Sequence, residues 1–169
     1  FKIDKEVTTK IYLTDEELEQ MHNKDLSKYP LLEHVRDIFL IGYYTGQRVS
    51  DFNYLSKDDI VTKDGVQYFK FVQKKNRKKG KIVMCPITKD IRDIMDKRYD
   101  GALPPSLSDQ CINDNIKDVG LELKLKELIK CEYTKGGKLI KDMVPKYKLI
   151  ESHSARRSFC SNMYLKQMP

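Results

Sequence analysis

Tryptophan is missing from this sequence, and two residues that often bind metals are scarce: it has four cysteines and three histidines among 169 residues. The cysteines are far apart and form no Cys-x-x-Cys pair, at positions 85, 111, 131 and 160. This spacing argues against a zinc site and against a disulfide framework, and it fits a reducing compartment. We therefore expect no metal site and a cytoplasmic protein.

Long apolar runs are also missing, so the sequence offers neither a membrane span nor a signal peptide. A length of 169 residues with 40% hydrophobic content is enough for one ordinary core, and we expect a single domain over residues 1–169. The chain starts at Phe1 and stops soon after a basic motif near its end. Both features favour an excised part of a longer protein.

Positive charge is concentrated in one segment, "KKNRKKGK" at residues 74–81. Its basic residues account for all but one unit of the net charge of +7. They are Lys74, Lys75, Arg77, Lys78, Lys79 and Lys81. Such a segment on a nearly neutral body is typical of proteins that bind polyanions. A solvated hairpin tip is the alternative interpretation.

Capping residues and apolar spacing predict several helices. In "YLTDEELEQM", Thr14 is the expected N-cap and Glu17 completes a capping box. "YPLLEHVRDIFLIGYYTG" predicts a buried central helix that starts at Pro30 and stops at Gly46. A short helix follows over residues 49–56. Two later helices are expected after caps Thr88 and Ser108, the second ending at Gly120, and a last one starts at residue 152 or 153.

Alternating and β-branched residues predict two hairpins. Residues 66–73 and 81–86 read as strands joined by the basic segment, and residues 127–142 read as a hairpin that turns at Gly136-Gly137. The expected fold class is therefore α+β, mainly helical, with a small antiparallel sheet.

The motif "HSARRS" places His153 and Arg156 three residues apart, on one face of the last helix near its start. Free backbone N–H groups at a helix N-terminus favour a bound phosphate. Arg157 points about 100° away around the helix and should serve a separate contact. Ala155, Phe159 and Met163 are expected to pack inward.

The motif "TGQRVSD" follows the most apolar helix, so it should hold Arg48 against the core with its guanidinium near the surface. Asp51 is expected to orient Arg48 through a charge-assisted hydrogen bond. Two arginines, a histidine and a hairpin lysine suit phosphoryl transfer without a metal. The guanidinium groups would stabilise the negative charge on the phosphate oxygens, and the lysine would protonate a leaving oxygen.

These three elements, in this order, resemble the tyrosine recombinases, or phage-type integrases, and the resemblance extends from "YLTDEEL" to the end of the chain. That family carries its first catalytic arginine in T-G-x-R-x-S-[ED], which matches Thr45 to Asp51, and its second in H-x-x-R, which matches His153 and Arg156. Its catalytic lysine lies in a β-hairpin after a glutamine. Lys75, after Gln73, is the best match, with Lys74 and Lys78 as alternatives.

The resemblance implies the DNA breaking-rejoining fold and site-specific recombination through a 3′-phosphotyrosine. It implies no cofactor, because the covalent linkage would keep the bond energy. Arg48 and Arg156 would hold the phosphate, Lys75 would be the general acid, His153 would assist proton transfer and Asp51 would support them. Double-stranded DNA would be contacted by the other basic residues of the hairpin and by the second arginine of the last helix: Lys74, Arg77, Lys78, Lys79, Lys81 and Arg157. The intact protein would form a tetramer on DNA in the bacterial nucleoid, whereas this chain alone would be monomeric.

The sequence departs from the family pattern at its end, because no segment with the family's nucleophilic tyrosine follows H-x-x-R. Tyr164 sits inside the predicted helix, and we interpret it as a packing residue; Tyr43 and Tyr44 lie on the core helix. We therefore expect a catalytic domain truncated before its nucleophile, without the N-terminal DNA-clamping domain, that binds DNA but does not cleave it. A type IB topoisomerase and a non-catalytic DNA-binding or regulatory module remain as alternatives.

Overall fold

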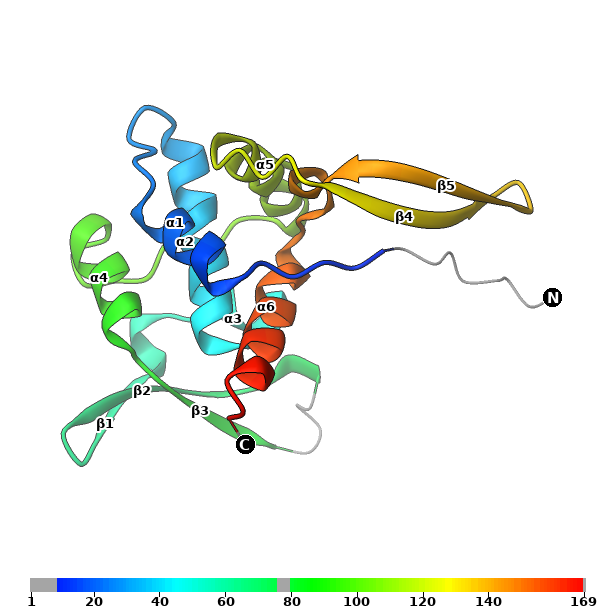
Figure 1. The fold of residues 1–169 in the computed structure, drawn as a ribbon. Helices are drawn as coiled ribbons and strands as arrows, with labels where there is room; N and C mark the ends of the chain where they lie inside the picture. Colours follow the sequence, from blue (N-terminus) through cyan, green and yellow to red (C-terminus); the bar gives the residue numbers. More distant parts are fainter. Residues whose placement is uncertain (1–8, 76–79, 169) are drawn as a thin grey trace.

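A computed structural model of the chain describes residues 9–75 and 80–168. Helix α2 runs through the middle of the molecule, and the other helices gather around it (Figure 1). The helices are α1 (Asp15–Asn23), α2 (Pro30–Thr45), α3 (Val49–Phe52), α4 (Lys89–Arg98), α5 (Asp109–Glu122) and α6 (Ser152–Leu165), with 3-10 turns η1 (Lys57–Asp59) and η3 (Lys146–Leu149). The predicted α+β class and the buried central helix are confirmed.

The ends of these helices follow from the capping residues that the sequence shows. Thr14 and Glu17 form the capping box of α1, and the hydroxyls of Thr88 and Ser108 accept hydrogen bonds at the starts of α4 and α5. Gly46 ends α2 with a left-handed backbone at φ 64°. The α3 helix is shorter than expected.

The interior also holds a charged cluster around α2. Arg36 is 1% exposed and Asp37 is fully buried, and their side chains pair at 3.0 Å. On α4, Arg98 Nε donates to Asp37 at 2.6 Å, and the hydroxyl of Tyr99 donates to the same carboxylate at 2.9 Å. A buried carboxylate with these partners fixes α4 against α2, because either charge left alone would be costly.

A three-stranded antiparallel sheet, in the order β1-β2-β3, lies below the helices in Figure 1. Its strands are β1 (Ile60–Lys63), β2 (Val66–Val72) and β3 (Ile82–Pro86). Strand β1 was not predicted, although the sequence carries its signal: Asp64-Gly65 is a two-residue hairpin turn, and both residues adopt positive φ. Phe69 of β2 is fully buried and joins the sheet to the helical core.

A second hairpin, β4 (Leu128–Lys135) with β5 (Lys138–Pro145), projects from the body on the right of Figure 1. It turns at Gly136-Gly137, both at positive φ, as the sequence predicted. At its base, η3 packs against α5.

The predicted end of α5 at Gly120 is wrong, since the helix continues to Glu122. Gly120 has a different task there. A Cβ on it would come within 2.7 Å of the Ile150 side chain and 2.9 Å of the Tyr147 Cβ, so the glycine allows η3 and the chain after it to pack closely on α5.

All four cysteines are free thiols. Among the helices in the described ranges, none combines the length and apolar character that a bilayer crossing requires.

Candidate active site

The turn that carries Arg48 is held by the end of α2. Gly46 N–H donates to the carbonyls of Gly42 and Tyr43, and the Thr45 hydroxyl donates to the Ile41 carbonyl at 2.7 Å. The chain then leaves the helix through the left-handed Gly46, and Arg48 becomes the extended N-cap of α3. Within residues 9–75 and 80–168, no hydrogen bond or ion pair involves the Arg48 guanidinium, which therefore remains free for a ligand.

Arg156 is brought to this same turn by helix α6. Its Nη1 donates to the carbonyl oxygen of Gly46 at 3.0 Å, although 110 residues separate them in sequence. The ring of Phe159, one turn further along α6, occupies the space where a Gly46 Cβ would stand, with its nearest atom 2.4 Å from that position. Arg48 lies two residues from Gly46, at most about 7 Å along the backbone. The structure thus brings the two arginine motifs together.

The basic hairpin is attached to the same turn. The Lys74 backbone N–H donates to Asp51 Oδ1 at 2.9 Å, and the Gln73 side-chain amide donates to Gln47 Oε1 at 2.8 Å. Lys75, the predicted general acid, is exposed and directly follows these anchored residues. The site therefore draws its residues from three separate parts of the chain.

Asp51 supports the site differently from the sequence-based expectation. It is 5% exposed, and its Oδ1 accepts from the Lys74 backbone, while its Oδ2 has no partner within the described residues. The expected hydrogen bond to Arg48 is absent from this part of the chain. The carboxylate instead holds the backbone of the segment that directly follows β2.

Lys74 Nζ lies 3.6 Å from the centre of the Tyr54 ring, in a cation–π contact. Lys74, one of the two alternatives to Lys75 as the general acid, therefore has its ammonium group against an aromatic ring. Arg77, Lys78 and Lys79 fall outside the described residues, and Lys81 is exposed just before β3.

His153 is exposed in the first turn of α6. Desolvation by its neighbours is the largest cause that lowers the pKa of its imidazole below the ordinary value, and the positive charges of Arg157 and Arg156 lower it further. At neutral pH the ring is therefore uncharged and can accept a proton. With Arg156, it lines a hollow of about 250 Å³ beside residues 10–12.

Arg157 has a separate contact, as expected, but that contact lies inside the protein. Its Nε donates to the Ile11 carbonyl at 3.0 Å, and its Nη2 pairs with Glu151 at 2.7 Å. Ser158 accepts from Leu13 N–H at 2.9 Å in the same region. The bonds to Ile11 and Leu13 fasten the N-terminal segment to α6. The sequence gives no clear signal of this role, because both of these partners are backbone groups far away along the chain.

The interpretation of Tyr164 as a packing residue is wrong, since its side chain is 82% exposed near the end of α6. It lies eight residues after Arg156, which corresponds to about 12 Å along a helix. Met163 and Phe159 are partly buried, and Ala155 is fully buried, as the helical pattern predicted.

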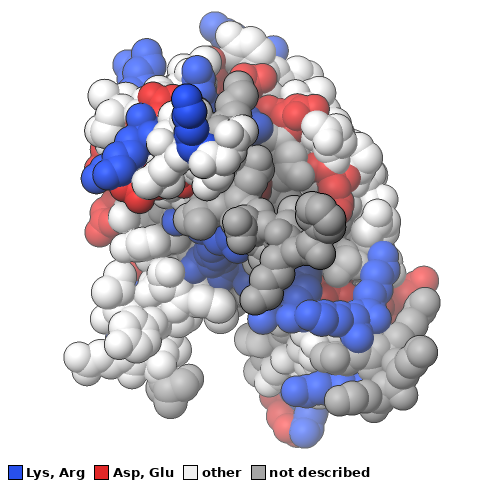
Figure 2. Space-filling view, turned by 90° about the vertical axis from the view of Figure 1, so that its right-hand side faces the viewer, with Lys and Arg blue, Asp and Glu red and all other residues white. Residues whose placement is uncertain are grey.

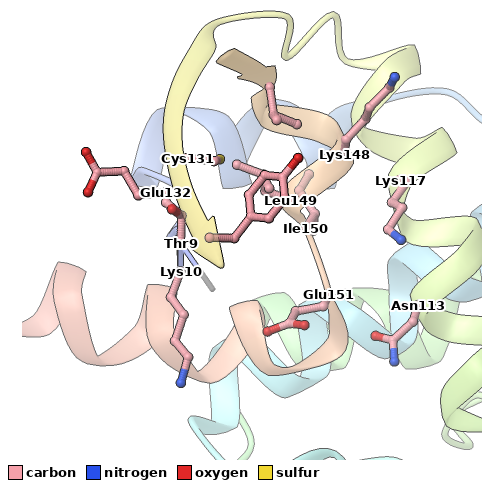
Figure 3. Close-up of a pocket in the computed structure, with 12 residues that line it drawn as sticks. Thr9, Lys10, Asn113, Lys117, Cys131, Glu132, Lys148, Leu149, Ile150 and Glu151 are labelled. Atoms are coloured by element: carbon pink, nitrogen blue, oxygen red, sulfur yellow. The ribbon is translucent and has the colours of Figure 1, made fainter. Parts of the chain in front are cut away.

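Figure 2 shows the side toward which the β4–β5 hairpin projects, and Lys and Arg side chains cross its middle and lower right. A larger hollow, of about 460 Å³, lies between that hairpin, α5 and η3. Its lysines Lys10, Lys117 and Lys148 point in different directions (Figure 3), so they do not converge on one anion.

The phage integrase family matches residues 11–169, and this range contains the arginine turn, the hairpin and α6. The chain belongs to the phage integrase family. The motif resemblance and the expected fold are thereby confirmed. No curated protein matches the chain.

Two crystal structures of the XerH site-specific recombinase share the fold of this chain. One is a post-cleavage complex with a palindromic difH substrate, with a TM-score of 0.58 and 15% identity. The other is a pre-cleavage complex with difH, with a TM-score of 0.59 and 16% identity. Each alignment covers 94% of this chain but only 43% and 44% of the XerH chains, so this chain spans less than half their length.

Proposed function

We propose that this chain forms one catalytic domain of an enzyme that performs site-specific recombination on double-stranded DNA in the bacterial cytoplasm. The observation that carries the proposal is the hydrogen bond from Arg156 to the Gly46 carbonyl, because it joins the H-x-x-R helix to the turn of Arg48. Two guanidinium groups from these segments can bind the non-bridging oxygens of one phosphodiester. The XerH structures, which hold difH DNA, support the same substrate class.

The proposed chemistry is a transesterification without a metal. A tyrosine oxygen forms a bond to phosphorus, the bond from phosphorus to the 5′-oxygen breaks, and the Lys75 ammonium gives that oxygen its proton. His153, uncharged at neutral pH, assists proton transfer at the attacking group. The 3′-phosphotyrosine keeps the bond energy, so a partner strand's 5′-hydroxyl can reverse the step. Arg48 and Arg156 bind the charge that develops on phosphate.

The nucleophile in this proposal comes from outside residues 1–169. Support comes from α6, which carries Tyr164 about 12 Å along its axis from Arg156. The full-length recombinase is proposed to have a second, N-terminal DNA-clamping domain and to assemble as a tetramer on two duplexes. The 169-residue chain alone is proposed to be monomeric, to bind duplex DNA weakly and to cleave none.

The test uses the full-length protein and a duplex selected by binding from a random-sequence pool. A covalent protein–DNA adduct at the 3′ side of a nick, abolished by Arg48→Ala, is the expected result. Relaxation of supercoiled plasmid that lacks the selected site would favour a topoisomerase. Binding without any adduct would favour a non-catalytic module.

Binding and chemistry can be separated on the hairpin. Lys75→Ala should leave the affinity for duplex DNA almost unchanged while cleavage collapses. Lys81→Ala should instead weaken binding and flatten the slope of log K against log salt by about 0.9, because one phosphate is no longer neutralised. Equal loss of binding and cleavage in Lys75→Ala would reduce the hairpin to an electrostatic patch.

A further inference from the structure

One side chain, that of Gln47, spans the gap between the arginine turn and both strands of the basic hairpin. Its Nε2 donates to the Thr45 carbonyl at 3.2 Å and contacts Cys85 Sγ, on β3, at 3.5 Å. Its Oε1 accepts from the Gln73 amide, at the end of β2, at 2.8 Å. Gln47 therefore has a partner on the arginine turn and on each strand of the basic hairpin.

An amide suits this position because it donates from one end and accepts at the other. Burial raises the pKa of the Cys85 thiol, so the sulfur next to Gln47 is uncharged. An apolar side chain of the same size would leave the Gln73 amide without this acceptor. Since Gln73 is two residues before Lys75, loss of the hydrogen bond between Gln47 and Gln73 would move the segment that carries the lysine.

We propose that Gln47 is a positioning residue, which sets the place of Lys75 relative to Arg48 through its hydrogen bond with Gln73. The inference rests on the proposed function. In the cleavage step, the arginines hold the phosphate while the Lys75 ammonium must reach the departing 5′-oxygen. A displacement of about 1 Å can cost about 100-fold in rate when a reacting group must be oriented.

The first test compares two leaving groups in single-turnover cleavage by the full-length protein on the selected duplex. One substrate has the normal 5′-oxygen at the scissile bond, and the other has sulfur there. A thiol ionises with a pKa of about 8.5, so sulfur leaves without a proton from the enzyme. We expect Gln47→Met to slow cleavage of the oxygen substrate about 10- to 100-fold and to leave the sulfur substrate within about threefold.

The controls separate this role from others. Lys75→Ala should likewise cleave the sulfur substrate faster than the oxygen substrate. Arg48→Ala should cleave both substrates slowly, because the guanidinium that binds the phosphate oxygens is missing. Gln110→Ala, which removes an exposed glutamine bond to Asp114 on α5, should change neither rate. Equal slowing of both substrates by Gln47→Met, or no slowing of either, would overturn the proposal.

A second measurement does not depend on cleavage. In the 169-residue chain, amide hydrogen exchange in Gln47→Met should be about tenfold faster at Val72 and Lys74 than in the unchanged chain, and unchanged in β4–β5. Unaltered exchange at the end of β2 would also overturn the proposal. If the unchanged full-length protein forms no adduct with either substrate, the proposed function fails, while this exchange result still decides whether Gln47 holds the hairpin.

Discussion

Replacing Gly46 with alanine should damage the site by a mechanism whose parts can be measured separately. Gly46 has φ 64°, where a residue with a Cβ costs about 1–2 kcal/mol. The new Cβ would also stand 2.4 Å from the Phe159 ring, and overpacking of this kind costs about 1–3 kcal/mol. We expect Gly46→Ala to lower the free energy of unfolding by about 2–5 kcal/mol.

Gly65 supplies the matched control for this substitution. It has φ 76°, yet a Cβ there has nothing within 4 Å, so Gly65→Ala should show only the backbone cost of about 1–2 kcal/mol. Urea denaturation of both variants gives the difference directly. The excess in Gly46→Ala should shrink when Phe159→Ala is added, since the smaller side chain removes the clash. Equal losses at Gly46 and Gly65, or an excess that Phe159→Ala leaves intact, would show that Phe159 does not restrict the side chain at position 46.

Three further predictions concern the charged cluster, the N-terminal segment and the histidine. Asp37→Asn should cost about 3–5 kcal/mol of unfolding free energy, because the buried Arg36 and the partly buried Arg98 both lose the carboxylate that they share. Glu132→Gln, in an exposed pair with Lys130, should cost less than about 1 kcal/mol in the same denaturation assay; similar losses at the two positions would contradict this. Ser158→Ala should cost about 1–3 kcal/mol, since it leaves the Leu13 N–H unpaired, and urea denaturation should show no such loss in Ser161→Ala. The fold lowers the pKa of His153, so NMR should show its imidazole titrating below the ordinary value of 6.5. Its contribution to stability is therefore present above the unfolded-state pKa and is lost as pH falls through the lower folded-state pKa. A titration midpoint at or above 6.5 would contradict this.

Local signals accounted for most of the fold. Capping hydroxyls at Thr14, Thr88 and Ser108 marked helix starts, and Gly136-Gly137 marked a hairpin, because each acts within a few residues. Gly120 was misread as a stop since its real role is close packing against Ile150, far along the chain. The sequence alone does not distinguish a glycine that ends a helix in a left-handed conformation from a glycine that allows two segments to pack closely.

The site was only partly visible in the sequence for a similar reason. Arg48, His153 and Arg156 stand in recognisable motifs. The motifs also include Gln47 and Gln73, but the hydrogen bond between these two side chains was not predicted, because it joins residues 26 positions apart. Asp51 was assigned to the wrong partner, since Arg48 is near in sequence and the Lys74 backbone is near only in the fold.

If Arg48 and Arg156 share one phosphate, a crystal structure of the chain with sulfate should show it. We expect one sulfate that accepts hydrogen bonds from both guanidinium groups, with His153 beside it. Sulfate bound to either arginine alone, with the two side chains facing separate surfaces, would show that they do not form one phosphate site.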